Sequence, residues 1–180
     1  MIIGVSGWAR AGKDTVADRL VDNFGFVKMS FAEPMREALV RLNPMIRVGG
    51  HPTELASAVR LMGWENLKGE SPDIRGLMQR LGTEVGREMF GENFWVDLAL
   101  ARVEPGMNVV FADCRFVNEA DAIKAAGGSV WRVERKDFGP ANDHISERAL
   151  DHYAFDSGVS NYESVDVLNG LVDELVASVL

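Results

Sequence analysis

The sequence contains a single cysteine, Cys114, among its 180 residues. No disulfide can therefore form within the chain, and we expect a reducing, cytoplasmic location, which is the host cytoplasm if a phage encodes the protein. No apolar run approaches the length of a membrane span. The first residues also lack the charged start and apolar stretch of a signal peptide. We expect no membrane partner.

Positive charge is also in short supply, since 19 Lys and Arg residues face 27 Asp and Glu residues and the net charge is −8. This balance argues against a broad nucleic-acid-binding surface, so we expect no nucleic-acid partner. The basic residues comprise 14 Arg and 5 Lys. Because a guanidinium grips phosphate through two donors at once, some arginines are expected where phosphates bind. A preference for arginine codons is the other explanation of the count.

The length of 180 residues predicts a single domain, residues 1–180, with room for insertions. Segments typical of strands alternate with segments typical of helices, which predicts a parallel sheet with helices on both faces. The expected strands cover residues 1–6, 26–31, 108–112, 129–133 and 157–160. The expected helices cover 14–23, a segment from about 34, and 53–62, 73–90, 94–103, 119–126 and 164–180.

The first strand leads into GWARAGKDT, a match to G-x-x-x-x-G-K with a helix after it. This context predicts a loop whose backbone N–H groups surround a phosphate, with the positive end of the helix beneath it. Lys13 brings a full positive charge to the outer phosphate oxygens. The candidate ATP-binding residues are Gly7, Arg10, Ala11, Gly12, Lys13, Asp14 and Thr15.

Two carboxylates are candidate Mg²⁺ ligands. Asp14 stands where Ser or Thr normally supplies a hydroxyl, and a carboxylate is also a hard oxygen ligand for Mg²⁺. Asp14 as a favourable charge at the helix start is the alternative. Asp113 ends the apolar strand at 108–112, where a phosphate-loop protein carries its second magnesium-side group, and Arg115 follows two residues later. We name Lys13, Asp113 and Arg115 as the catalytic candidates.

A second substrate is expected near the helices that follow the second strand. Met35 and Arg36 begin a helix at a strand end, where ligands of open parallel sheets bind, although Arg36 as a plain surface charge is equally consistent. Polar side chains recur every four residues on the helix at 73–90, as a solvated helix face also requires. Trp95 either stacks on a base or fills the core. The acceptor candidates are Met35, Arg36, Arg75, Gln79, Gly82, Thr83, Arg87, Trp95 and Arg115.

A charged segment at about 134–150 completes the set of candidate regions. Phosphoryl transfer needs a basic segment that closes over the donor phosphates and excludes water, whereas an exposed loop of mixed charge is the alternative. The candidate lid residues are Arg132, Arg135, Lys136, His144, Ser146 and Glu147. The histidines lack partners at metal-ligand spacing, so we assign no zinc site.

Several stretches resemble a known family, in its order along the chain. They are GWARAGKDT, VKMSFAEPMREAL, LMQRLGTEVGR followed by FW, ADCRF followed by NEA, and DHISE. Together they resemble the phage-type deoxynucleoside monophosphate kinases, relatives of the adenylate-kinase-like P-loop kinases. The resemblance implies a three-layer α/β P-loop kinase fold with a helical acceptor-binding insertion at about 35–104 and a lid at about 134–150. Residues 43–72 match the family poorly.

The resemblance also implies roles for particular residues. Met35 and Arg36 contact the acceptor nucleotide, and Arg115 holds its phosphate. Gln79, Gly82, Thr83 and Trp95 shape the pocket for the base and sugar, and residues 132–147 supply the lid. In this family GKDT is part of the usual loop pattern, so Asp14 is an expected residue.

The expected activity is transfer of the γ-phosphoryl group of ATP, with Mg²⁺, to a (deoxy)nucleoside 5′-monophosphate. The alternatives are a P-loop kinase for another small acceptor, such as a coenzyme precursor or phosphomevalonate, and a non-catalytic nucleotide sensor. The expected partners are small-molecule nucleotides, and the resemblance makes a homodimer plausible.

Overall fold

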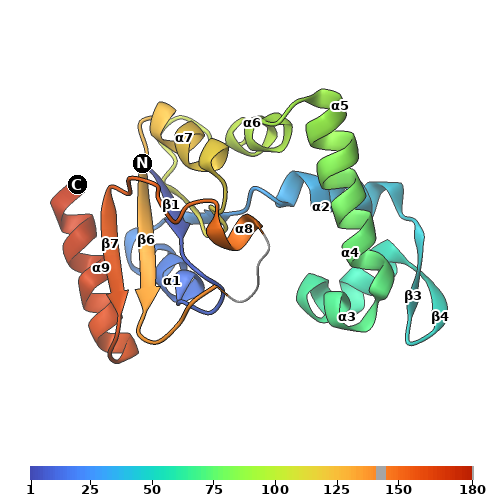
Figure 1. Cartoon of the computed structure of the whole chain (residues 1–180), viewed down its shortest axis with the longest axis horizontal. Coiled ribbons are helices and arrows are strands. Elements are labelled where there is room, and N and C mark those ends of the chain that lie inside the picture. The colour runs from blue at the N-terminus through green and yellow to red at the C-terminus, as the bar shows by residue number, and fades with distance from the viewer. Residues whose placement is uncertain (141–144, 180) are drawn as a thin grey trace. The chain divides into compact units, whose positions relative to one another are not determined.

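The structure is a computed structural model, and it describes residues 1–140 and 145–179. The chain forms two compact units (Figure 1). Unit 1 consists of Met1–Phe31 and Leu100–Leu180, and unit 2 of Ala32–Ala99. Whether they act as one kinase domain with an acceptor-binding insertion stays a prediction.

Unit 1 contains a parallel sheet with β1 at its centre. Its described strands are β1 (Ile2–Ser6), β2 (Val27–Met29), β5 (Val109–Phe111), β6 (Ser129–Arg135) and β7 (Ser157–Asn161). They lie in the order β2-β5-β1-β6-β7, and every neighbouring pair is parallel. The expected parallel sheet is confirmed. The strand order changes direction at β1, and in open sheets ligands bind beyond the carboxyl ends of the strands at such a point.

Alternate side chains of β1 face different helices. Ile3 and Val5 belong to one buried cluster with apolar residues of α1 (Lys13–Phe24) and α9 (Val165–Val179). Gly4 points the other way, where an added Cβ would collide with Ile123 of α7 (Val117–Ala125). Figure 1 shows α9 alongside β7, with β6 and β1 following in that order. Helices therefore cover both faces of the sheet, as the sequence predicted.

Strand β6 extends further than expected, to Arg135 rather than residue 133. Its last residues pair in parallel with β7, Glu134 with Ser160 and Arg135 with Asn161. Arg132 is buried within this strand. The irregular segment expected from residue 132 therefore starts later, because β7 offers backbone partners up to residue 135.

Unit 2 packs helices around a small β-hairpin. Its elements are α2 (Glu33–Leu42), β3 (Met45–Val48), β4 (His51–Glu54), α3 (Leu55–Glu70), α4 (Pro72–Gln79), η1 (Arg80–Arg87), α5 (Glu88–Phe90) and α6 (Phe94–Leu100). The core of this unit comprises Leu39, Ile46, Leu55, Ala58, Leu67 and Ile74. Apart from the described helices of both units, which are all too short or too polar to cross a membrane, nothing was tested for spanning.

The hairpin corrects the sequence analysis, which placed a helix at 53–62 within an otherwise irregular segment. In the structure, β3 and β4 pair in antiparallel fashion as far as Glu54, and α3 starts only at Leu55. Gly49 and Gly50 form the turn between the strands with φ values of 56° and 84°. Two-residue hairpin turns with positive φ at both positions favour glycine. The Gly-Gly pair was the available signal for this hairpin.

The expected helix at 73–90 has a π-helical middle, η1. Trp95 donates a hydrogen bond from Nε1 to the Gly82 carbonyl at 2.9 Å, and an added Cβ on Gly86 would overlap its indole ring. A Cβ on Gly82 would come within 2.9 Å of Met35 Sδ. Both glycines therefore let large side chains pack directly on the helix backbone. Tertiary packing of this kind is invisible to periodicity.

We expect Gly86→Ala to destabilise the protein by about 1–3 kcal/mol, because the added methyl group has no space beside Trp95. The control is Gly76→Ala on α4, where no atom lies within 4 Å of the added Cβ. Alanine is the better helix former, so this control should gain about 0.5–1 kcal/mol. Urea unfolding measures both changes, and equal stability of the two variants would contradict the packing described for Trp95.

Candidate active site

The loop between β1 and α1 passes close to the ends of two neighbouring strands. A Cβ on Gly7 would lie 2.5 Å from the Val133 carbonyl oxygen, and one on Gly12 would lie 2.6 Å from Asn161 Nδ2. The φ values of these glycines, 151° and 107°, also lie in the region that favours glycine. Both glycines of the phosphate-loop motif are therefore required by close approach as well as by conformation.

Asn161 at the end of β7 holds this loop from the side. Its Nδ2 donates a hydrogen bond to the Ala11 carbonyl oxygen at 2.8 Å. This bond fixes the orientation of a peptide group immediately before Gly12 and Lys13. The sequence analysis did not name Asn161 as a site residue. A polar side chain at a strand end was the only available signal, and the partner 150 residues away was not predictable.

Lys13 lies folded into the loop, and only 9% of it is exposed. Its Nζ donates hydrogen bonds to the carbonyl oxygens of Gly7 and Trp8, at 2.7 and 2.8 Å. Burial, reinforced by the positive charge of Arg115, lowers the pKa of Lys13 to about 8, although the negative charge of Glu147 opposes the shift. These electrostatic effects show that Lys13, Arg115 and Glu147 lie close to one another.

Glu147 reaches the same loop from α8 (Ile145–Arg148). The backbone N–H of Ala9 donates to Glu147 Oε2 at 3.1 Å. Arg115 Nη1 lies 3.8 Å from Glu147 Oε1, and 8% of the Glu147 side chain is exposed. The structure thus brings together three of the predicted residues, Lys13, Arg115 and Glu147.

Asp113 follows β5 and is held by the segment after β2. It accepts hydrogen bonds from Ser30 Oγ at 2.6 Å and from the Phe31 backbone N–H at 3.0 Å. Asp14 forms an ion pair with Lys28 at 2.8 Å, with 82% of its side chain exposed. Mg²⁺ usually takes one or two protein carboxylates and completes its shell with water and substrate phosphates. The oxygen donors of Asp113 and Asp14 fit an ion of this kind.

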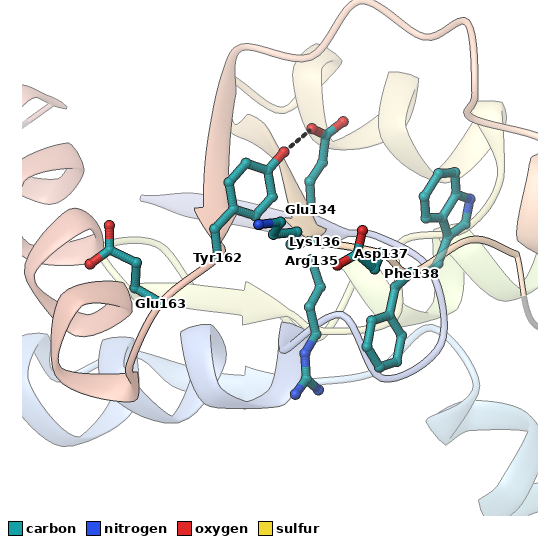
Figure 2. Close-up of a pocket in the computed structure, with 8 residues that line it drawn as sticks. Glu134, Arg135, Lys136, Asp137, Phe138, Tyr162 and Glu163 are labelled. Carbon is teal, nitrogen blue, oxygen red and sulfur yellow. Dashed lines mark hydrogen bonds between the residues drawn. The ribbon is translucent and has the colours of Figure 1, made fainter.

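A cavity of about 580 Å³ opens beside the loop at the ends of β6 and β7. It is lined by Trp8, Glu134, Arg135, Lys136, Asp137, Phe138, Tyr162 and Glu163 (Figure 2). The Tyr162 hydroxyl lies 3.5 Å from Glu134 Oε2, as the dashed line in Figure 2 marks. The sequence analysis missed the aromatic residues Trp8, Phe138 and Tyr162. Their signal was their position in the phosphate loop or just beyond strands that end beside it.

The basic residues predicted for the lid lie near this cavity. Arg135 Cζ lies 4.5 Å from the centre of the Phe138 ring, and its Nη1 donates to the Arg10 carbonyl oxygen at 3.2 Å. The Arg132 guanidinium lies over the rings of Trp8 and Phe155, at 5.0 and 5.5 Å. His144 and the side chain of Ser146 lie outside the described residues.

The acceptor candidates other than Arg115 lie in unit 2. Arg36 Nη2 is 3.7 Å from Glu65 Oε1, and its guanidinium lies 6.0 Å from the centre of the Trp64 ring. Gln79 and Thr83 are exposed, as is Arg75, and Arg87 is half-buried. Met35, Gly82 and Trp95 form the packed cluster described above. Because Arg36 and Arg115 belong to different units, their predicted convergence on one phosphate stays a prediction.

Comparison with known proteins gives a consistent family. Residues 53–172 match the family model described as "Deoxynucleotide monophosphate kinase". A protein of Acanthamoeba polyphaga mimivirus, named "Putative deoxynucleotide monophosphate kinase", is 29% identical over 202 residues, covering 100% of this chain and 94% of that protein. The "Deoxynucleotide monophosphate kinase" of Escherichia phage RB69 is 29% identical over 108 residues, covering 57% of this chain and 44% of that protein.

The parallel sheet and its glycine-bounded lysine loop define an α/β fold of the P-loop kinase class. The chain belongs to the deoxynucleotide monophosphate kinase family, and it is a nucleoside monophosphate kinase. The family resemblance inferred from the sequence is thereby confirmed. The shikimate kinase of Bacteroides thetaiotaomicron has a TM-score of 0.47 and 13% identity over 98% of both chains, too distant a likeness to carry an argument.

We expect Asn161→Asp to weaken ATP binding by about tenfold or more, because a carboxylate would face the Ala11 carbonyl oxygen that now receives an N–H donor. The control is Asn66→Asp, which changes the charge equally at an exposed amide that donates to the Met62 carbonyl. Isothermal titration calorimetry measures both affinities. Equal ATP affinity of the two variants would contradict the role given to Asn161.

Proposed function

We propose that this kinase transfers the γ-phosphoryl group of ATP to a deoxynucleoside 5′-monophosphate. The bond between the γ-phosphorus and the β,γ-bridging oxygen breaks, an oxygen of the acceptor phosphate bonds to the same phosphorus, and ADP and a deoxynucleoside diphosphate leave. The observation that carries the proposal is an anion site at the phosphate loop. There the Ala9 N–H, Lys13 and Arg115 surround one carboxylate, that of Glu147.

The loop residues bind the donor phosphates in this proposal. Gly7 and Gly12 let the backbone approach closely, and the N–H groups between Arg10 and Thr15 point toward phosphate oxygens. Lys13 exchanges its two carbonyl partners for the γ-phosphate, so that its charge moves onto the group in transfer. No general base is needed, because the acceptor oxygen is already ionised.

Magnesium is the metal that fits the two carboxylates, with Asp113 and Asp14 as its protein ligands. When bound, Mg²⁺ neutralises charge on the donor phosphates. Ser30 and the Phe31 N–H hold Asp113 in a fixed orientation. Asp14 must give up its ion pair with Lys28 to serve, which is feasible for a pair with so exposed a carboxylate.

The cavity beside the loop suits the base of the donor. Phe138 and Tyr162 supply aromatic surface, and such rings stack on a planar base. Trp8 Nε1 is buried and has no hydrogen-bond partner among the described residues. A ligand in this cavity would satisfy that donor. Arg132, Arg135 and Lys136 would add positive charge near the phosphates from the predicted lid.

The acceptor is assigned to unit 2 together with Arg115. Arg36, Arg75 and Arg87 supply charge for an anionic substrate, and Gln79 and Thr83 supply hydrogen bonds to its base. Trp95 and Met35 shape this surface by packing on Gly82 and Gly86. Nucleotides are the proposed partners, and the homodimer and the cytoplasmic location stay predictions. The family match gives no support to another small acceptor or to a non-catalytic sensor.

A coupled ADP-release assay across the common ribo- and deoxyribonucleoside monophosphates tests the proposed function. We expect turnover with at least one deoxynucleotide, and we expect Lys13→Met to reduce it about a hundredfold or more, since a transition-state charge partner is lost. Lys124→Met on α7 is the matched control and should keep the wild-type rate, because Lys124 pairs with Asp156 and the Ala154 carbonyl. Tight ATP binding without product from any monophosphate would favour a sensor.

Arg115→Lys tests the assignment of the acceptor phosphate. The substitution keeps the charge but loses the planar fork that binds phosphate through two donors, so we expect KM for the monophosphate to rise about tenfold. The KM for ATP should change much less. Arg102→Lys, the same change at an exposed position of unit 1, should leave both constants unchanged. A rise confined to the KM for ATP would reassign Arg115 to the donor.

A further inference from the structure

The Glu147 carboxylate occupies the position that the proposed function gives to a donor phosphate. One of its oxygens accepts the Ala9 N–H at 3.1 Å, and the other faces Arg115 at 3.8 Å. Its negative charge also acts on Lys13. A loop amide, a lysine and an arginine are the groups that bind phosphate at such loops. Two anions do not share one such set of donors.

The carboxylate also balances a concentration of positive charge. Lys13 experiences the like charges of Arg115 and Arg132, and both act against its protonation. Glu147 is nearly buried, so its attraction to these groups is less screened than that of a surface ion pair. Removing this negative charge leaves the cationic groups without their anion. Their attraction for an added phosphate then increases.

The mounting of Glu147 permits such an exchange. It lies on α8, a helix of four residues, which is too short to be stable on its own. The chain becomes firmly held just after it, where Leu150 is buried and Asp151 lies 3.6 Å from Arg132 Nη2. The side chain is therefore presented to the loop from a short element next to a fixed point.

We propose that Glu147 is an internal substitute for phosphate, an autoinhibitory contact that the donor nucleotide displaces from the loop. The inference rests on the proposed function, since it takes the donor site to be this loop. It assigns Glu147 a role opposite to that of a phosphate ligand: its carboxylate weakens nucleotide binding. Cationic residues of the predicted lid would strengthen it.

Calorimetric titration with ADP, which binds without turnover, tests this inference on the full chain. We expect Glu147→Gln and Glu147→Ala to bind ADP at least about fivefold more tightly than the wild type, because the competing charge is gone. Glu104→Gln removes an equal charge from an exposed position of unit 1 and should bind like the wild type. The glutamine variant keeps the size of the side chain, so agreement between both Glu147 variants identifies charge as the cause.

A thermal unfolding scan supplies a second readout. Without ADP, the Glu147 variants should unfold at a lower temperature than the wild type, because the clustered cations lose their partner. Saturating ADP should raise their unfolding temperature by more than it raises that of the wild type. A residue with a purely structural role would lower both temperatures alike.

The outcomes separate the two proposals. ADP binding by both Glu147 variants that is equal to or weaker than that of the wild type would overturn the inference and leave the donor site standing. Lys13→Met, titrated in parallel, tests the donor site itself and should lose most of its ADP affinity. If Lys13→Met binds ADP as the wild type does, the donor site is misplaced, whatever the Glu147 variants show.

Discussion

The site depends on how closely the backbone of one loop approaches the ends of two neighbouring strands. Gly7 lies against the Val133 carbonyl of β6, and Gly12 lies against the Asn161 side chain of β7. The Asn161 amide then fixes the Ala11 carbonyl. A single methyl group at either glycine would push the loop away from the sheet. The orientation of the loop N–H groups, the position of Lys13 and the cavity beside Trp8 all follow from this contact.

A loop held in this way concentrates positive charge, and the rest of unit 1 is arranged around that charge. Burial and Arg115 lower the pKa of Lys13 to about 8, so its protonated form needs a nearby anion. Glu147 is that anion in this structure, while Asp113 is kept in place by Ser30 and Phe31. An ATP phosphate is a stronger anion of the same geometry. Binding is therefore an exchange of one anion for another.

Much of this was predictable from sequence, for identifiable reasons. The parallel sheet, α1, α9 and the phosphate loop follow from local patterns: apolar strands, helical spacing, and Gly7 and Gly12 around Lys13. The hairpin at Gly49 and Gly50 had a local signal that was overlooked. The contacts of Trp95, Asn161 and Glu147 join residues far apart in the chain or depend on packing, and no periodicity reveals them.

The central claim is that the loop presents the γ-phosphoryl group of ATP to an acceptor phosphate. Incubation with ATP labelled at the γ-phosphorus and a deoxynucleoside monophosphate, followed by separation of the products, tests it most directly. The account predicts that the label appears in the β-phosphate of a deoxynucleoside diphosphate, in an amount equal to the ADP formed. Label found only in ATP or in inorganic phosphate, with the monophosphate unchanged, would contradict it.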